Sequence, residues 1–356
     1  MYGSTFNCGI EKIGDNHVTK FYFESLNDKF TPENNQGEQI EKSINMLLDI
    51  VFNPLLESGR FKEEYVNSEK NNIKQLIESK IDNKDSYAAS RCIEEMYEGK
   101  GYGLYKYGYV EDLDNITAEN LYEYYSKLMA TCKIDIFVSG DISKNPVEEI
   151  VAKNENIVKL DCRDGIITRL ATKQEPPVNG AKVIEEKMDI AQGKLVLGIT
   201  LDTSKKGSRF PAALYNVILG ESATSKLFQN VREKESLAYT IRSRYVKQKA
   251  NIYISAGIEV EKYEKTLEII KEQLQDMKTG NFTEEDLNNA KKYLISGIKS
   301  VKDEQDSEIV YYIGQEFAEE LTTFEEYEEK VNTVTREDIE KIADSVQINT
   351  VYFLRN

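Results

Sequence analysis

The sequence GNFTEEDLN (residues 280–288) has a close copy in GRFKEEYVN (residues 59–67), and the fold prediction starts from this repeat. A second pair of blocks follows in the same order, NITAENL at 115–121 and TVTREDI at 333–339. The copies lie about 220 residues apart, far beyond the roughly 20–50-residue period of a solenoid. The sequence therefore predicts one duplicated domain.

The repeat divides the chain into two halves joined by a linker. Residues 1–153 form the first half, 154–180 the linker, and 181–356 the second half. The linker contains PPVNG at 176–180, a rigid and turn-rich sequence. The length of 356 residues agrees with about two domains.

Hydrophobic periodicity predicts strands and helices in the same order in both halves. In the first half we expect strands at 5–10, 18–24 and 134–138, and helices at 38–52, 61–81, 87–97 and 118–129. In the second half we expect strands at 181–188, 194–201, 239–246, 252–258 and 350–354, and helices at 209–219, 225–234, 262–278, 283–300, 304–320 and 336–344. This order predicts an α+β fold with tandem duplicated halves, each a sheet covered by helices on one face.

The second half begins with a segment that has no counterpart in the first half. Tyr2 aligns with Tyr239, and residues 181–238 precede the latter with two predicted strands and two predicted helices. We therefore expect a first half truncated at its N-terminus, with an exposed sheet edge and an uncovered apolar surface. Such surfaces favour self-association of the truncated form.

Composition excludes several classes of function. The formal charge of −16 disfavours nucleic-acid binding, which depends on Lys and Arg neutralising phosphates. No apolar run approaches the ~20 residues of a membrane span, so we expect no membrane partner. The N-terminus does not resemble a signal peptide, and the scattered single cysteines are typical of a reducing compartment. We expect a cytoplasmic protein with four free thiols, Cys8, Cys92, Cys132 and Cys162.

His17 is the only histidine in the chain, which excludes most zinc chemistry. Two-histidine zinc motifs cannot be built from it, nor can clusters of several histidines. It opens a predicted strand, HVTKFYF at 17–23, where a histidine is typically structural rather than catalytic.

The segment GESATSKLFQNVREKESLAY at 220–239 is the most specific in the chain. With its small-residue turn, Leu-Phe, an Arg and Leu-x-Tyr, it resembles the second-half signature of the M16 (insulinase or pitrilysin-like) metallopeptidases. The resemblance covers essentially the whole chain, because that family consists of duplicated α/β halves. It is closest to the bacterial subgroup of inactive subunits that work beside an active sister.

The resemblance implies a zinc site that this chain does not reproduce. Active members bind zinc through His-x-x-Glu-His on a first-half helix, which the repeat places before residue 1. In active members a further zinc ligand, a Glu, lies seven residues after another acidic residue. Here Glu69 occupies the acidic position and Leu76 the ligand position. An apolar side chain cannot bind zinc, although an alignment shifted by two residues would put Glu78 there. We expect no cofactor in this chain and a zinc ion in its partner.

The same resemblance assigns a role to Arg232 and Tyr239. In active members an Arg and a Tyr at this spacing reach from the second half to the zinc site. The Tyr hydroxyl can donate to the oxyanion of the tetrahedral intermediate, and the Arg can bind the peptide. The alternative is that Arg232 pairs near a helix end and Tyr239 only starts a strand.

We therefore predict a non-catalytic subunit of a heterodimeric M16-type zinc peptidase, inactive alone. It encloses a peptide substrate and contributes Arg232 and Tyr239 in trans to a zinc-bearing sister subunit. Two alternatives remain open at this point: a fragment of an active M16 zinc metallopeptidase, and an M16-fold scaffold or binding protein without peptidase function.

Overall fold

The computed structural model describes residues 3–30, 38–160, 163, 166, 181–318 and 320–356. It contains two compact units, which we describe one at a time. The larger unit comprises Lys80–Tyr105 and Ala171–Asn356, and the smaller comprises Met1–Ser79 and Lys106–Leu170. The boundaries 1–153, 154–180 and 181–356 were inferred from the repeat and stay a prediction. The linker begins with helix α7 (Glu155–Leu160), and most of its remainder lies outside the described residues.

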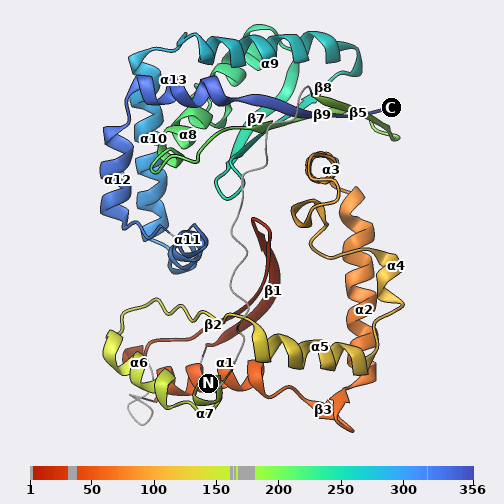
Figure 1. The fold of residues 1–356 in the computed structure, drawn as a ribbon, viewed down its shortest axis with the longest axis vertical. Coiled ribbons are helices and arrows are strands. Elements are labelled where there is room, and N and C mark those ends of the chain that lie inside the picture. Colours follow the sequence, from red (N-terminus) through yellow and green to blue (C-terminus); the bar gives the residue numbers. More distant parts are fainter. Residues whose placement is uncertain (1–2, 31–37, 161–162, 164–165, 167–180, 319) are drawn as a thin grey trace. The chain divides into compact units, whose positions relative to one another are not determined.

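A five-stranded sheet forms the centre of the larger unit (Figure 1). Its strand order is β5-β9-β6-β8-β7, with β5 parallel to β9 and the other neighbours antiparallel. The strands are β5 (Lys182–Lys187), β6 (Gly193–Thr200), β7 (Ala238–Val246), β8 (Asn251–Ile258) and β9 (Gln347–Arg355). All five predicted strands of the second half are confirmed, with bounds shifted by one to three residues.

The main core lies between this sheet and the helices of the second half. Leu195, Leu197 and Ile199 of β6 point into it at every second position, as the strand period requires. The surrounding helical segments are α8 (Arg209–Asn216), η5 (Val217–Glu221), η6 (Phe228–Lys234), η7 (Val260–Lys262), α9 (Tyr263–Lys278), α10 (Glu284–Lys302), α11 (Gln305–Phe317), α12 (Phe324–Thr333) and α13 (Arg336–Ser345).

The opposite face of the sheet is also covered, which corrects the expectation of helices on one face. Helix α3 (Lys84–Met96) lies against β6 and β9 there (Figure 1). Its Ala88 and Cys92 are fully buried against Val196 and Tyr352. Because both faces are covered, residues 195–201 are apolar almost without interruption rather than alternating.

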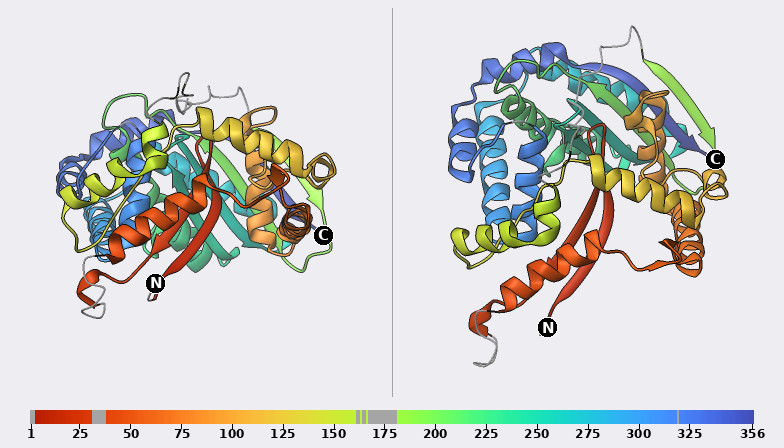
Figure 2. Two further views of the ribbon diagram at one scale, coloured as in Figure 1. Left: turned by 90° about the horizontal axis from the view of Figure 1, so that it is seen from below. Right: turned by 60° about the horizontal axis from the view of Figure 1, so that its bottom comes forward.

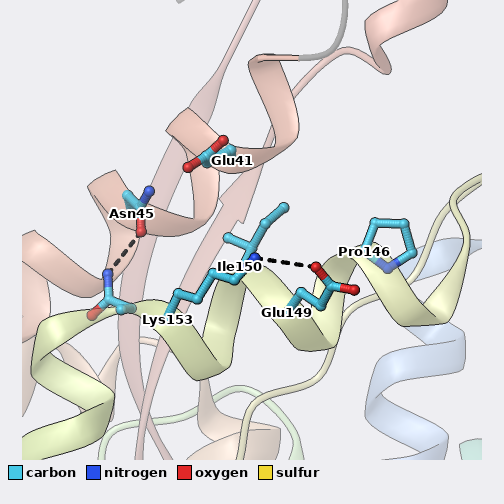
Figure 3. A pocket seen from close by; sticks show the side chains of 7 residues that line it. Glu41, Asn45, Pro146, Glu149, Ile150 and Lys153 are labelled. Atoms are coloured by element: carbon cyan, nitrogen blue, oxygen red, sulfur yellow. Dashed lines mark hydrogen bonds and ion pairs between the residues drawn. The ribbon is translucent and has the colours of Figure 1, made fainter.

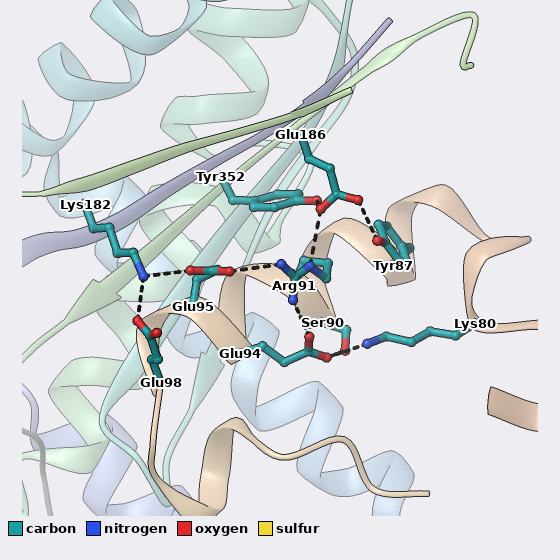
Figure 4. A network of polar contacts seen from close by, with 10 residues as sticks. All are labelled: Lys80, Tyr87, Ser90, Arg91, Glu94, Glu95, Glu98, Lys182, Glu186 and Tyr352. Atoms are coloured by element: carbon teal, nitrogen blue, oxygen red, sulfur yellow. Dashed lines mark hydrogen bonds and ion pairs between the residues drawn. The ribbon is translucent and has the colours of Figure 1, made fainter. Parts of the chain in front are cut away.

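A network of charged and phenolic side chains fastens α3 to the sheet (Figure 4). Arg91 donates to Glu94 at 2.8 Å, to Glu95 at 2.9 Å and to Glu186 of β5 at 3.3 Å. The hydroxyls of Tyr87 and Tyr352 each donate to Glu186 at 2.6 Å. Burial opposes the charged form of Glu186, but these donors outweigh it and lower its pKa.

The smaller unit contains a hairpin of β1 (Thr5–Ile13) and β2 (Asn16–Glu24), as predicted. Helix α1 (Gln39–Phe52) packs beside β2 and α6 (Lys144–Lys153), as Figure 2 shows. Helix α5 (Ala118–Thr131), predicted at 118–129, begins after Thr117, whose hydroxyl accepts a hydrogen bond from the backbone N–H of Asn120. The remaining elements are η1 (Asp28–Phe30), β3 (Leu56–Glu57), β4 (Arg60–Phe61), α2 (Glu63–Glu78) and α4 (Val110–Leu113); η3 (Ser79–Ile81) follows α2, and η4 (Gly101–Gly103) belongs to the larger unit.

The predicted strand at 134–138 is wrong, because these residues are not in a strand. Its counterpart in the repeat is β9, which pairs with β5 and β6 and not with β7 or β8. The hairpin of β1 and β2 corresponds to β7 and β8, so it offers no partner in the repeat's strand order. An extended segment without ladder partners does not become a strand.

Replacing Arg91 by Gln should lower the free energy of unfolding by about 1–2 kcal/mol at pH 7. Glu94 and Glu186 would then keep their charges in a partly buried site without the guanidinium. Urea unfolding followed by circular dichroism measures the change. Lys265→Gln, which removes an exposed ion pair with Glu268 on α9, is the control and should cost less than about 0.5 kcal/mol.

The same network should make stability depend on pH. Burial opposes the charge of Glu94, but hydrogen bonds from Lys80 and Arg91 lower its pKa, as the donors to Glu186 do for that group. A lowered folded-state pKa contributes stability above the ordinary value of about 4.3 and loses it as pH falls further. The difference between wild type and Arg91→Gln should therefore shrink between about pH 6 and pH 3. A difference that stays constant over this range would contradict the role given to these carboxylates.

Candidate functional site

Arg232 lies in η6, a π-helical turn that ends shortly before β7. Its guanidinium lies over the ring of Phe228 at 4.7 Å and 3.7 Å from a carboxylate oxygen of Glu233. The side chain is 42% exposed, so its donors can reach a ligand. Turns of this kind are rare and occur often at functional sites.

Tyr239 lies at a β-bulge near the start of β7. Ala238 is paired with Ile258 and Thr240 with Gly257, so Tyr239 is the extra residue. A bulge turns a side chain out of the regular alternation. Tyr239 is 59% exposed, and Ser236, three residues earlier, has a left-handed backbone with φ of 51°.

Among the residues that the structure describes, the hydrogen-bond partner of the Tyr239 hydroxyl lies on the loop after β8. The hydroxyl donates to Oε1 of Glu259 at 3.2 Å, and Nζ of Lys262 lies 3.0 Å from the same oxygen. Lys262 also donates to the carbonyl of Ser236 at 3.3 Å. The hydrogen bonds from Lys262 and Tyr239 lower the pKa of Glu259. The phenol is thus oriented by a charged pair on an exposed surface.

In the part of the chain that the structure describes, no hydrogen bond, ion pair or ring contact joins Arg232 to Tyr239. Their separation in sequence places them on different elements, η6 and β7. Each is an exposed donor with its own acidic neighbour. The arrangement can bind and stabilise negative charge on a ligand, and the described residues include no metal-ligand group.

Glu259 and Lys262 were not predicted as site residues, although the order of the predicted strands indicates that they lie near Tyr239. The predicted strands 239–246 and 252–258 are joined by a short connection and so pair antiparallel. The residue after the second strand then lies beside the start of the first. The bulge at Tyr239 had no such signal.

The described residues do not fit the zinc site of the active peptidases. Within residues 3–30, 38–160, 163, 166, 181–318 and 320–356, no group of three or more His, Cys, Asp or Glu side chains could hold a metal ion. His17 lies on β2 opposite Lys12, and partial burial followed by the Lys12 charge lowers its pKa. Leu76 is 44% exposed on α2, which also carries Glu69 and Glu78.

The cysteines of the described region are free thiols in different surroundings. Cys8 is exposed, Cys132 is half-buried, and Cys92 is buried under the sheet, where burial raises the pKa of its thiol to about 12. Cys162 lies outside the described residues. None of the helices that the structure describes combines the length and apolar character needed to cross a bilayer.

A cavity of about 260 Å³ lies between α1 and α6 in the smaller unit (Figure 3). Asn154 donates to Asn45 at 2.7 Å, and Lys153 lies 3.1 Å from Glu149. These polar side chains therefore pair with one another and do not present a set of donors that point together into the cavity. The lining includes neither Arg232 nor Tyr239, so we do not place the site in this cavity.

Comparisons of the sequence and the fold with known proteins identify the family of this chain. Residues 115–294 match the model described as the peptidase M16 inactive domain. The chain is 34% identical over its whole length to "Probable inactive metalloprotease YmfF" of Bacillus subtilis, of which it covers 82%. A conserved protein from Enterococcus faecalis has the same fold, with a TM-score of 0.89 at 24% identity over 100% of this chain and 82% of that one. A peptidase M16 inactive domain from Pseudomonas fluorescens gives a TM-score of 0.77 at 18% identity over 99% of this chain and 81% of that one.

The purified chain should contain far less than one zinc per molecule after dialysis against zinc and then buffer, and should cleave no peptide alone. The reason is the absence of a ligand set among the described residues and the single histidine of the sequence. Elemental analysis measures the metal, and His17→Gln serves as the control, since it removes weak binding by the exposed imidazole. One tightly held zinc per chain with chelator-sensitive proteolysis would show an active peptidase instead.

Proposed function

Because the chain belongs to the M16 peptidase family, we propose that it is the non-catalytic subunit of a heterodimeric zinc peptidase. In this proposal a sister subunit binds the zinc, and this chain helps to enclose the peptide and contributes Arg232 and Tyr239. The observation that carries it is the exposed Tyr239 hydroxyl, presented by a bulge in a chain whose described residues include no metal-ligand set.

The chemical role that we propose for Tyr239 is hydrogen-bond donation to an oxyanion. Peptide hydrolysis passes through a tetrahedral intermediate whose oxygen carries negative charge, and a preorganised donor stabilises that charge. The phenol has one O–H group, and in the free chain it donates its hydrogen bond to Glu259. When the peptide reaches the site, the hydroxyl turns to the oxyanion while Lys262 continues to neutralise Glu259.

Arg232 has a different role in the proposal, namely binding the peptide. Its contact with Glu233 is long at 3.7 Å and exposed, and such pairs contribute little. The guanidinium is therefore available to a peptide carbonyl or carboxylate, which it can bind through two parallel hydrogen bonds. The ring of Phe228 beneath it limits the orientations of the side chain.

We place this pair of subunits in the cytoplasm. The three cysteines of the described region are free thiols, as is usual in a reducing compartment. The net charge of −16 is typical of a protein that does not bind nucleic acid.

Tyr239→Phe should reduce peptide cleavage by the reconstituted pair about 10²–10³-fold, because it deletes one oxyanion donor and keeps the ring. Tyr124→Phe, which removes an exposed hydroxyl from α5 in the smaller unit, is the matched control and should leave cleavage unchanged. Gel filtration checks that both variants assemble. Wild-type turnover from an assembled Tyr239→Phe pair would mean that this tyrosine has no chemical role.

Arg232→Ala should instead raise KM more than it lowers kcat, since the proposed contact is to the bound peptide. Arg232→Lys should restore only part of the lost affinity, because an ammonium group cannot form two parallel hydrogen bonds. Steady-state kinetics of the pair separate the two parameters. Full rescue by Lys would show that only the charge matters at this position.

A further inference from the structure

One strip of the central sheet lies beyond the helix that covers the rest of its face. Helix α3 contacts β6, β9 and part of β8 on that face. The even-numbered residues of β7 lie on the same side, because Ile241 and Tyr245 belong to the opposite core. Thr240, Arg242 and Arg244 are exposed there, next to Ser255 and Gly257 of β8. We call these five residues the β7–β8 strip.

Arg242 and Arg244 are the charged members of the strip. Within the described residues, neither side chain makes a hydrogen bond or an ion pair, although burial raises the pKa of Glu221 and the charge of Arg244 acts to lower it. Many other cations of this acidic chain are paired with carboxylates, as Lys182 is with Glu95. Two exposed arginine side chains that make no ion pair with the described residues, in a chain of net charge −16, point to an external anion.

The neighbours of these arginines on β8 and in the loop before β6 carry no charge. Ser255 is paired with Arg242 and Gly257 with Thr240, whereas Arg244 is paired with Tyr253, whose ring is buried in the core under α3. Gln192 places its carbonyl oxygen over Gly257 beside the Thr240 hydroxyl. These are neutral polar groups, and β7 is an edge strand with no neighbour on its outer side in the described sheet. A peptide segment lying along the exposed edge of β7 would meet two cations.

We propose that the β7–β8 strip binds an extended acidic peptide segment whose carboxylates pair with Arg242 and Arg244. The inference rests on the proposed function, because the segment belongs to the peptide that the subunit helps to enclose. It adds a substrate class, acidic peptides, and a surface separate from Arg232 and Tyr239.

The strand geometry also specifies the spacing of the acidic residues. Arg242 and Arg244 are two positions apart on one face, about 6.5–7 Å along the strand. An extended peptide presents side chains to one face at the same interval. Acidic residues at alternate positions, as in Glu-x-Glu, therefore match both guanidinium groups, whereas adjacent acidic residues point to opposite faces.

Two fluorescent peptides of equal composition test this proposal on the chain alone. One has Glu at alternate positions separated by Ser, and the other has Glu in adjacent pairs separated by pairs of Ser. Fluorescence anisotropy at low salt should show binding of the alternating peptide, weakened as ionic strength rises. The Arg242→Gln/Arg244→Gln variant should bind it about tenfold more weakly, since two exposed ion pairs with the peptide are lost.

The control variant is Lys265→Gln/Lys341→Gln, which removes the same charge from α9 and α13 and should bind like wild type. Equal affinity for the two peptides, no binding of the alternating peptide, or unchanged binding by the double arginine variant would each overturn the proposal. The outcome is independent of zinc chemistry. A chain that binds the alternating peptide but does not activate a zinc-bearing sister would refute the proposed function and leave this surface intact.

Discussion

The antiparallel pairing of β7 with β8 is the constraint on which the site depends. Its register places Ala238 opposite Ile258 and Thr240 opposite Gly257, and the bulge between them turns Tyr239 outward. The same register brings the loop after β8, with Glu259 and Lys262, to the Tyr239 hydroxyl. A slip by one residue would exchange the faces of the strand. Ile241 would then leave the core, and Arg242 would enter it.

The sheet can hold this strand in place because both of its faces are packed. The second-half helices cover one face, and α3, from the first half of the sequence, covers the other through Ala88 and Cys92. The network around Arg91 and Glu186 fixes α3 with charged hydrogen bonds at its rim. A rigid sheet behind an exposed edge strand is a suitable support for the hydroxyl that we propose as a donor to the oxyanion.

Much of this fold could be predicted from local sequence. Helices were predicted at 118–129, 283–300 and 336–344, and the structure has them, each preceded by a capping box whose first residue is Thr117, Thr283 or Thr335. Helix α12 was missed although it carries the same signal, Thr323 with Glu326. The prediction of a strand at 134–138 was wrong because a strand needs hydrogen-bonded partners elsewhere in the chain, and a local pattern does not show whether they are present.

The site could be predicted only in part. The sequence indicated Arg232 and Tyr239 through a family resemblance, but the bulge that exposes the tyrosine depends on the register with β8. The π-helical turn around Arg232 likewise depends on packing, since its sequence has an ordinary helical pattern. Nothing in the sequence indicated that both faces of the sheet are covered, because α3 is far from the second-half strands along the chain.

The central claim is that this chain completes a peptidase whose zinc lies in another subunit. The most direct measurement is to titrate the chain into a zinc-bearing M16 sister from the same organism while following peptide cleavage. Our account predicts little cleavage by either protein alone and a rise that saturates at equal amounts of the two chains. A sister that is fully active alone, with no change on addition of this chain, would contradict it.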